Sequence, residues 1–206
     1  MPAAAEALAR LRAGNHRFLT AGPTTLADPA RRAALVTGQT PFAIILGCSD
    51  SRVPAELVFD QGFGDLFVIR VAGNIVAPSQ VGSVEFAAAR FGTRLAVVLG
   101  HSQCGAVSAT IDALQGRATS ASPFLRAIVD RVRPAVETLL AADPAAEPDA
   151  LLPAAVRANV RASAHQLRHG SALLEGLIRT DGFHVVGAEY SLETGRVDFL
   201  DDVPGD

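Results

Sequence analysis

The chain has 206 residues, of which 49% are hydrophobic and 19% charged, and its formal net charge is −3. This length suits one domain with a sizeable core, and the composition is far from that of disordered chains. The small negative charge gives no reason to expect nucleic acid or an anionic membrane as a partner, and no apolar run reaches the ~18 residues of a transmembrane helix.

Two helices are predicted ahead of the first strand. Residues 4–19 carry apolar side chains at helical spacing, with an interruption near Gly14 and Asn15, and Asp28-Pro29 is typical of a helix start that continues to about residue 36. Because neither helix lies between two strands, we expect this N-terminal arm, residues 1–36, to pack on something else. A partner subunit is a candidate.

Strands and helices alternate from residue 42 onward. Strands are expected at 42–47, 66–71, 94–99, 183–188 and 195–200, with a hairpin before the last one. Helices are expected at 53–59, 79–91, 104–114, 123–142 and 151–179, the last one long enough to be interrupted. This alternation predicts a single α/β domain over residues 1–206, with a core at 37–200. Its central sheet would have about four mostly parallel strands plus an antiparallel edge strand, flanked by helices.

Both cysteines follow predicted strands. Cys48 comes directly after strand 42–47, and His101 and Cys104 come after strand 94–99. Ligand chemistry collects outside the carboxyl ends of such strands. Two cysteines admit a disulfide, a metal site or inert burial. The N-terminus lacks a basic segment followed by an apolar one, so the expected location is the reducing cytoplasm, which argues against the disulfide.

The nearby histidine favours the metal site. Cys48, His101 and Cys104 offer two thiolates and one imidazole, a set that suits Zn²⁺, with one ion per chain. Three protein ligands leave one tetrahedral position open, which is typical of catalytic rather than structural zinc. Asp50, two residues beyond Cys48, is the candidate for a fourth ligand in a closed state.

The nearby Arg52 suggests a second possible role for Asp50, in orienting zinc-bound hydroxide. Two thiolates neutralise the charge of the zinc ion, so the metal acidifies bound water less than a three-histidine site does. A carboxylate held bidentately by Arg52 could accept the hydrogen of zinc-bound hydroxide and orient it. An ordinary structural ion pair is the alternative interpretation of Asp50 and Arg52.

Three motifs together resemble the β-class carbonic anhydrases, and the similarity runs from about Ala7 to Val197. They are Cys48-Ser49-Asp50-Ser51-Arg52-Val53, Arg70-Val71-Ala72-Gly73-Asn74 and Gly100-His101-Ser102-Gln103-Cys104-Gly105-Ala106-Val107. The resemblance implies a zinc enzyme that interconverts CO₂ and bicarbonate. Cys48, His101 and Cys104 would be the zinc ligands, and Asp50 and Arg52 the catalytic dyad. It also implies a homodimer or tetramer whose pocket is built between subunits.

The same resemblance implies substrate-binding residues. Gln39 matches a glutamine that binds substrate or acetate-like anions, although an ordinary loop residue is an equal alternative. Phe67 matches an apolar residue of the CO₂ pocket, and Gly105 matches a backbone donor beside it. Phe86 stands where many members carry tyrosine, so the apolar wall would remain without the hydroxyl.

A regulatory bicarbonate pocket, known in one subgroup of the family, is less well matched. Ile45 stands where that subgroup has tryptophan, although Arg70 and Tyr190 fall at its other two positions. Elsewhere, His165 and His169 lie four residues apart on a predicted helix and could chelate a metal. A solvated or packed helix face is the favoured interpretation of that pair.

Two further functions stay open. A related zinc hydrolase could act on a CO₂-like heterocumulene such as carbon disulfide, which would need a remodelled access route. A zinc-binding homologue could also have lost catalysis. The presence of Asp50 and Arg52 argues against this second alternative, because a storage or structural site has no need of them.

Overall fold

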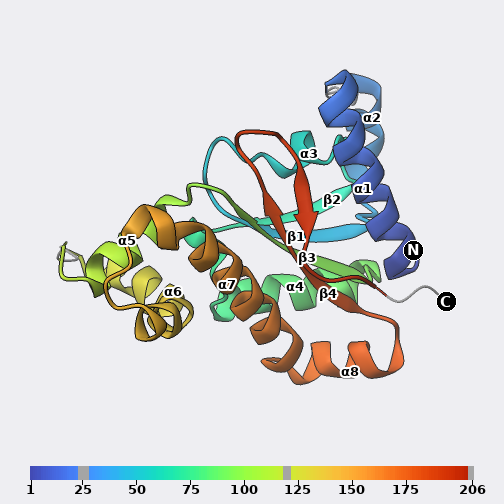
Figure 1. Cartoon of the computed structure of the whole chain (residues 1–206). Helices are drawn as coiled ribbons and strands as arrows, with labels where there is room; N and C mark the ends of the chain where they lie inside the picture. Colours follow the sequence, from blue (N-terminus) through green and yellow to red (C-terminus); the bar gives the residue numbers. More distant parts are fainter. Residues whose placement is uncertain (23–27, 118–121, 204–206) are drawn as a thin grey trace.

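The computed structural model describes residues 1–22, 28–117 and 122–203. Its centre is a five-stranded sheet in the order β2-β1-β3-β4-β5 (Figure 1). The strands β2, β1, β3 and β4 run parallel, and β5 pairs antiparallel with β4. The predicted α/β fold with an antiparallel edge is therefore confirmed. The strands are β1 (Ala43–Gly47), β2 (Leu66–Arg70), β3 (Leu95–His101), β4 (His184–Tyr190) and β5 (Val197–Phe199).

The helices follow the predicted order, and most begin with a proline or a capping side chain. Asp28, for example, accepts a hydrogen bond from the backbone N–H of Ala30 at the start of the second helix. Within the described residues the α-helices are α1 (Ala4–Ala21), α2 (Pro29–Ala34), α3 (Ala55–Val58), α4 (Pro78–Phe91), α5 (Gly105–Leu114), α6 (Pro123–Ala142), α7 (Pro148–His169) and α8 (Ala172–Thr180), with 3₁₀ turns η1 (Leu35–Thr37) and η2 (Ala72–Asn74). Part of the predicted loop at 116–121 lies outside the described residues.

The sheet is covered on both faces. Alternate residues of β1 point to opposite sides, so Ile45 packs in a cluster with α1 and α3, whereas Ile44 packs in a cluster with α4, α7 and α8. Such two-sided burial explains the continuous apolar runs that marked the parallel strands. Gly100 of β3 allows α7 to come close, because a Cβ there would lie 2.4 Å from a methyl group of Val160.

A third apolar cluster lies where α5, α6 and the first half of α7 meet. In Figure 1, α5 and α6 stand to one side of the sheet, away from α1. This cluster includes both cysteines, together with Val107 and Ile111 of α5 and Val132 of α6. The predicted metal ligands therefore lie at the boundary between the sheet and this helical cluster.

The N-terminal helix packs on its own chain. Its buried stripe, which includes Leu8 and Leu11, covers one face of the sheet, whereas α2 buries none of its residues. The predicted interruption at Gly14 and Asn15 is wrong, since α1 continues to Ala21. Gly14 instead allows close packing, because a Cβ there would lie 1.8 Å from the carbonyl oxygen of Phe59.

Two other boundaries differ from the prediction. Strand β3 continues to His101, so the histidine is the last residue of the strand rather than part of the following loop. The predicted long helix at 151–179 is divided into α7 and α8, and the side chain of Ser171 caps α8 by accepting a hydrogen bond from the N–H of Leu174.

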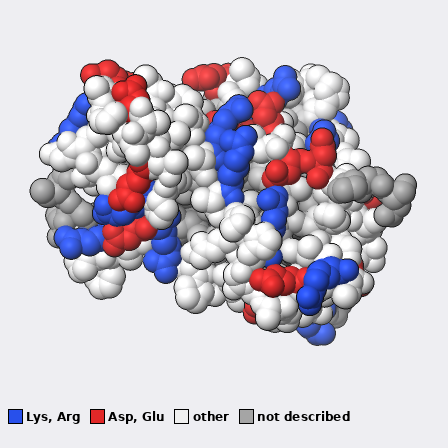
Figure 2. All heavy atoms as spheres, turned by 60° about the horizontal axis from the view of Figure 1, so that its bottom comes forward, with Lys and Arg blue, Asp and Glu red and all other residues white. Residues whose placement is uncertain are grey.

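In the part of the chain that the structure describes, no helix combines the length and hydropathy needed to cross a membrane. Acidic and basic groups lie beside one another on the face shown in Figure 2. Such interleaving favours local ion pairs over a large field of one sign.

Candidate metal centre

Three ligand atoms meet at the carboxyl end of the sheet. Cys48 follows β1, His101 ends β3 and Cys104 is the residue that caps α5. Their ligand atoms all lie within 4.8 Å of one another, and all three residues are buried. Because β1 and β3 are neighbouring parallel strands, the arrangement brings together the two motifs that the sequence placed about fifty residues apart.

The loop between His101 and Cys104 has an unusual backbone that lets both side chains reach the same point. Gln103 adopts a left-handed conformation with φ of 57°, which is uncommon for residues other than glycine. The neighbouring Ser102 is fixed to β4, since its N–H donates to the carbonyl oxygen of Tyr190 at 2.9 Å. The end of β4 therefore fixes the loop that carries two of the three ligands.

The tautomer of His101 fits metal binding. Its Nδ1 lies 2.8 Å from the carbonyl oxygen of Ser102, which fixes the proton on that nitrogen. The buried Nε2 has no hydrogen-bond partner within the described residues. An imidazole lone pair left unpaired beside two cysteine sulfurs is the arrangement that a zinc ligand requires. The donor set therefore fits a zinc ion.

The two thiols have very different proton affinities without a metal. The contact with Cys104, helped by the neighbouring His101 imidazole and opposed by burial, lowers the pKa of Cys48 to about 4. The same contact with Cys48, together with burial, raises the pKa of Cys104. Burial is the largest influence on His101 and opposes its charged form, but Cys48, the carbonyl oxygen of Ser102 and the carboxylate of Asp50 together outweigh it and raise the pKa of the imidazole. One thiolate is thus already formed before a cation binds.

Asp50 and Arg52 form the predicted bidentate pair next to these ligands. The guanidinium donates from Nε to Oδ1 at 2.8 Å and from Nη2 to Oδ2 at 2.7 Å. The side-chain hydrogen bond from Arg52 lowers the pKa of Asp50 well below its usual range. The Asp50 Oδ2 lies 3.9 Å from the Nε2 of His101. The carboxylate therefore stands beside the three ligand atoms while being held by the arginine.

The segment from β2 to η2 supports the turn that carries Cys48 and Asp50. Arg70 donates from Nε to the carbonyl oxygen of Cys48 at 3.1 Å and from Nη2 to that of Asp50 at 2.6 Å. The N–H of Gly73 donates to the Cys48 sulfur at 3.3 Å. These contacts were not predicted from the sequence, although Arg70 and Gly73 belong to one of the three motifs that resemble the family. In this chain Arg70 contacts the backbone of the candidate site.

The four predicted substrate-binding residues fall into two places. Gly105 is the first residue of α5, next to Cys104, and a Cβ there would meet nothing within 4 Å. Phe67 pairs with Ile44 in the sheet, which is four residues before Cys48. At a rise of ~3.3 Å per residue, Phe67 therefore lies about 13 Å from the metal ligands along the strand.

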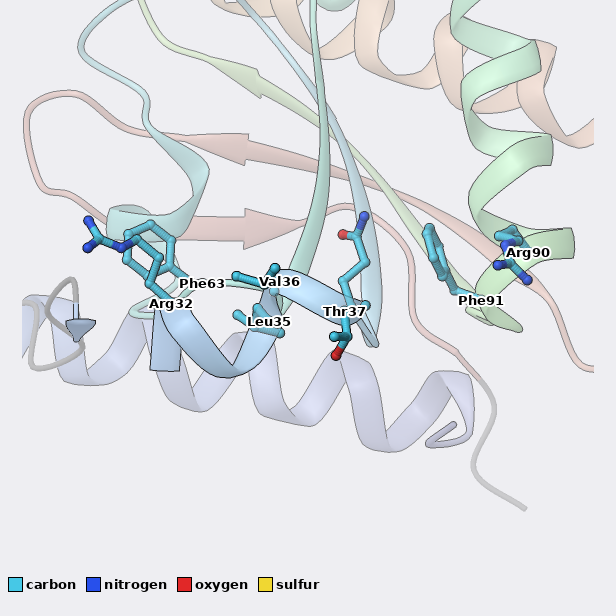
Figure 3. A pocket seen from close by; sticks show the side chains of 10 residues that line it. Arg32, Leu35, Val36, Thr37, Phe63, Arg90 and Phe91 are labelled. Carbon is cyan, nitrogen blue, oxygen red and sulfur yellow. The ribbon is translucent and has the colours of Figure 1, made fainter. Parts of the chain in front are cut away.

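Phe86 and Gln39 lie on the same side of the molecule as Phe67. The ring centroids of Phe67 and Phe86 are 6.1 Å apart, and both rings contact Phe91. Gln39 and Phe91 line an open pocket of about 570 Å³. Figure 3 shows Thr37 of η1 on one side of this pocket and Phe91 of α4 on the other. Within one chain, Gln39, Phe67 and Phe86 thus form a group that is separate from the metal ligands.

Comparisons with known proteins agree with the motifs. Residues 43–197 match the family model described as carbonic anhydrase. The chain is 38% identical over 194 residues to carbonic anhydrase 2 of Mycobacterium tuberculosis, covering 94% of this chain and 91% of that relative. The structure of the β-carbonic anhydrase CafA of Aspergillus fumigatus is 25% identical with a TM-score of 0.75, covering 86% of this chain and 83% of that one.

A further solved structure is similar in fold. It comes from a study of two tetrameric β-carbonic anhydrases of Sordaria macrospora, with 23% identity and a TM-score of 0.76. The likeness covers 86% of this chain and 89% of that chain.

Proposed function

The chain belongs to the carbonic anhydrase family, in its β class, and we propose that it catalyses the reversible hydration of CO₂ to bicarbonate and a proton. The observation that carries the proposal is the convergence of Cys48, His101 and Cys104 beside the ion pair of Asp50 and Arg52. A site that merely stored a metal would gain nothing from a carboxylate held next to it by an arginine.

Cys48, His101 and Cys104 would hold one Zn²⁺ per chain. When bound, the metal supplies a Lewis acid that generates a nucleophile from water. Asp50 would accept a hydrogen bond from that nucleophile and so direct its lone pair at the carbon of CO₂. Arg52 keeps Asp50 ionised, and therefore an acceptor, by holding its pKa low. If Asp50 were released from Arg52, its carboxylate could become a fourth ligand and close the site.

The substrate pocket would need a second copy of the chain. Gly105 lies next to Cys104, and its backbone N–H at the helix start is free of an intrahelical partner, so it could bind an oxygen of substrate or product. Phe67 lies about 13 Å along the strand from the ligands of its own chain, and Phe86 and Gln39 lie on the same side of the molecule as Phe67, so this group would not contact the same CO₂ molecule. We assign them to the site of a partner subunit in a homodimer or tetramer. Phe86 is 54% exposed in the single chain, which supports this assignment.

Zinc analysis and stopped-flow CO₂ hydration test the proposal. His101→Ala and Cys104→Ala should lose zinc on dialysis and with it the activity, whereas Arg52→Ala should keep zinc but lose most of the rate. His16→Ala, which removes an exposed histidine of α1, serves as the control and should change neither quantity. A Cys104→Ala variant that keeps one zinc per chain and full activity would overturn the ligand assignment.

The same measurements separate the alternatives. Wild-type protein that binds one zinc per chain but hydrates no CO₂ would point to a non-catalytic zinc protein. If that protein hydrolyses carbon disulfide instead, the heterocumulene hydrolase would be the correct function.

A further inference from the structure

Two histidines outside the candidate active site face solvent at the end of α7. His165 and His169 are both exposed, and their ring centroids are 4.5 Å apart with an angle of 49° between the planes. Within the described residues neither ring makes a hydrogen bond or an ion pair, and the two rings contact each other. The ring nitrogens are therefore available to an external ligand.

The spacing of the rings agrees with chelation of one ion. With metal–nitrogen bonds of about 2.1 Å and about 1.1 Å more to each ring centre, two imidazoles at right angles have centroids about 4.5 Å apart. A tetrahedral angle would place them about 5.2 Å apart. Right angles between neighbouring ligands belong to square-planar and octahedral coordination, which Cu²⁺ and Ni²⁺ prefer with imidazole ligands.

The position on the helix also favours a cation. His169 is the last residue of α7, and the carboxyl end of a helix carries a partial negative charge from its unpaired carbonyl groups. Residues four apart on a helix lie on the same face, which is the arrangement of the two zinc-binding histidines in His-Glu-x-x-His helices. Arg161, one turn before His165, is a nearby positive charge that opposes binding.

We propose that His165 and His169 form a second metal site, which chelates a divalent ion of the Cu²⁺ or Ni²⁺ type at two neighbouring coordination positions. The site is independent of the zinc centre. Val156 of α7 packs in the cluster that contains Cys48 and Cys104. His169 lies thirteen residues further along the same helix, which corresponds to about 20 Å. Occupation of the second site therefore leaves the candidate active site undisturbed.

Nickel–nitrilotriacetate is a suitable probe, because its chelator leaves two neighbouring positions on the ion free. Zinc-loaded, untagged protein should be retained on this matrix, and calorimetry with free Ni²⁺ should give one additional site per chain. His165→Ala and His169→Ala should each remove that site and weaken retention at least tenfold. The His16→Ala protein should behave as wild type, because its histidine has no partner one turn away.

A rearranged variant keeps the number of histidines constant. Gln166 is exposed, so the double substitution Gln166→His with His169→Ala retains two surface imidazoles but places them at adjacent positions that point to different faces of α7. This variant should fail to bind Ni²⁺, with unchanged zinc content and unchanged CO₂ hydration. If it binds as well as wild type, or if wild type shows no site beyond that of the His165→Ala variant, the proposal is wrong.

Discussion

Individual side chains of the candidate site are fixed mainly by backbone groups of neighbouring segments. Arg70 bridges the carbonyl oxygens of Cys48 and Asp50, and Gly73 donates to the sulfur of Cys48. Partners of this kind orient metal ligands and adjust their basicity. Arg70 therefore acts as a positioning residue: its contacts hold the backbone from which the first ligand and the carboxylate of the proposed dyad both project.

Loss of Arg70 should reduce activity without removing zinc. In Arg70→Gln the turn at Cys48–Asp50 loses both guanidinium contacts, and the rate of CO₂ hydration should fall by about 10–100-fold, as for other outer partners of metal sites. The absorption spectrum of the cobalt-substituted protein should shift as well, because the ligand geometry relaxes. Arg133→Gln is the control, since Arg133 pairs with Asp130 and Glu137 on the surface of α6, away from the candidate site. An unchanged rate and spectrum in Arg70→Gln would contradict this role.

Asp201 provides a pH-dependent contribution to stability. Burial is the largest influence and favours its neutral form, but hydrogen bonds from the N–H of Gly187 and from Arg168, together with the positive charges of Arg168 and Arg161, outweigh it and hold the pKa of Asp201 below 3.8. Because the pKa is lowered by folding, the stabilisation is present above the unfolded-state pKa and is lost as the pH falls through the folded-state value.

The Asp201→Asn substitution should therefore destabilise the protein at pH 7 and progressively less as the pH approaches the acidic range. Urea unfolding of both proteins at pH 7, 4, 3 and 2.5 gives the difference in the free energy of unfolding at each pH, and the loss is expected below the unfolded-state pKa of 3.8. A difference that stays constant, or that grows towards acid, would show that the carboxylate does not contribute in this way.

At the level of elements, the buried side chain of Asn15 joins α1 to the opposite end of the chain. The amide of Asn15 donates to the carbonyl oxygens of Val58 and Gly195, and its Oδ1 accepts from the N–H of Val197 at 2.9 Å. Asn15 is 5% exposed, so these groups have little access to water. The contact fixes α1 to the turn between β4 and β5. Strand β4 also holds Ser102, which lies in the loop between His101 and Cys104.

Asn15→Ala should be among the more destabilising single changes in α1. It leaves two carbonyl groups and one N–H without a partner, and a buried polar group without a partner costs about 1–3 kcal/mol. We expect the free energy of unfolding, measured in urea, to fall by about 3 kcal/mol. The activity of the variant should recover in part when it is assayed at low temperature. Thr20→Ala is the control, since the Thr20 hydroxyl bonds within the exposed end of the same helix. Equal stability of the two variants would refute the argument.

At the scale of the whole molecule, the chain contains eighteen arginines and no lysine. Arginine stays charged throughout the accessible pH range and suits ion pairs with carboxylates. Many of these arginines are committed to such pairs, which agrees with the interleaved charges of Figure 2. A surface of this kind is compatible with association between copies of the chain.

Mixing of subunits tests whether the site is shared. Cys104→Ala lacks a complete set of ligands, whereas Gln39→Ala lacks a residue that we assign to the partner's pocket. Random pairing of the two inactive variants should restore about a quarter of the sites, because half of the dimers are mixed and each contains one intact site. Stopped-flow CO₂ hydration before and after co-refolding measures the recovery. No recovery, in protein shown by sedimentation to be mixed dimers, would place Gln39 outside the partner's site.

The sequence by itself determined the strands, their mostly parallel direction and the set of metal-ligand candidates. These features are local: buried strands require continuous apolar runs, and residues directly after neighbouring parallel strands must emerge at the same edge. The bidentate pairing of Asp50 with Arg52 was also predictable, since the two residues are only two positions apart in the chain. The resemblance to a known family came from motifs that are each continuous.

Only the tertiary structure decided the contacts between distant segments. Asn15 was interpreted as a helix interruption. Its partner Val197 is 182 residues away, and no local sequence pattern predicts such a hydrogen bond. The contacts of Arg70, and the separation of Phe67 from the ligands of its own chain, depend on the register between β1 and β2. The chemistry that a site can perform is predictable from its residues and their sequence neighbours. The distance between residues far apart in the chain follows instead from how the helices and strands pack together.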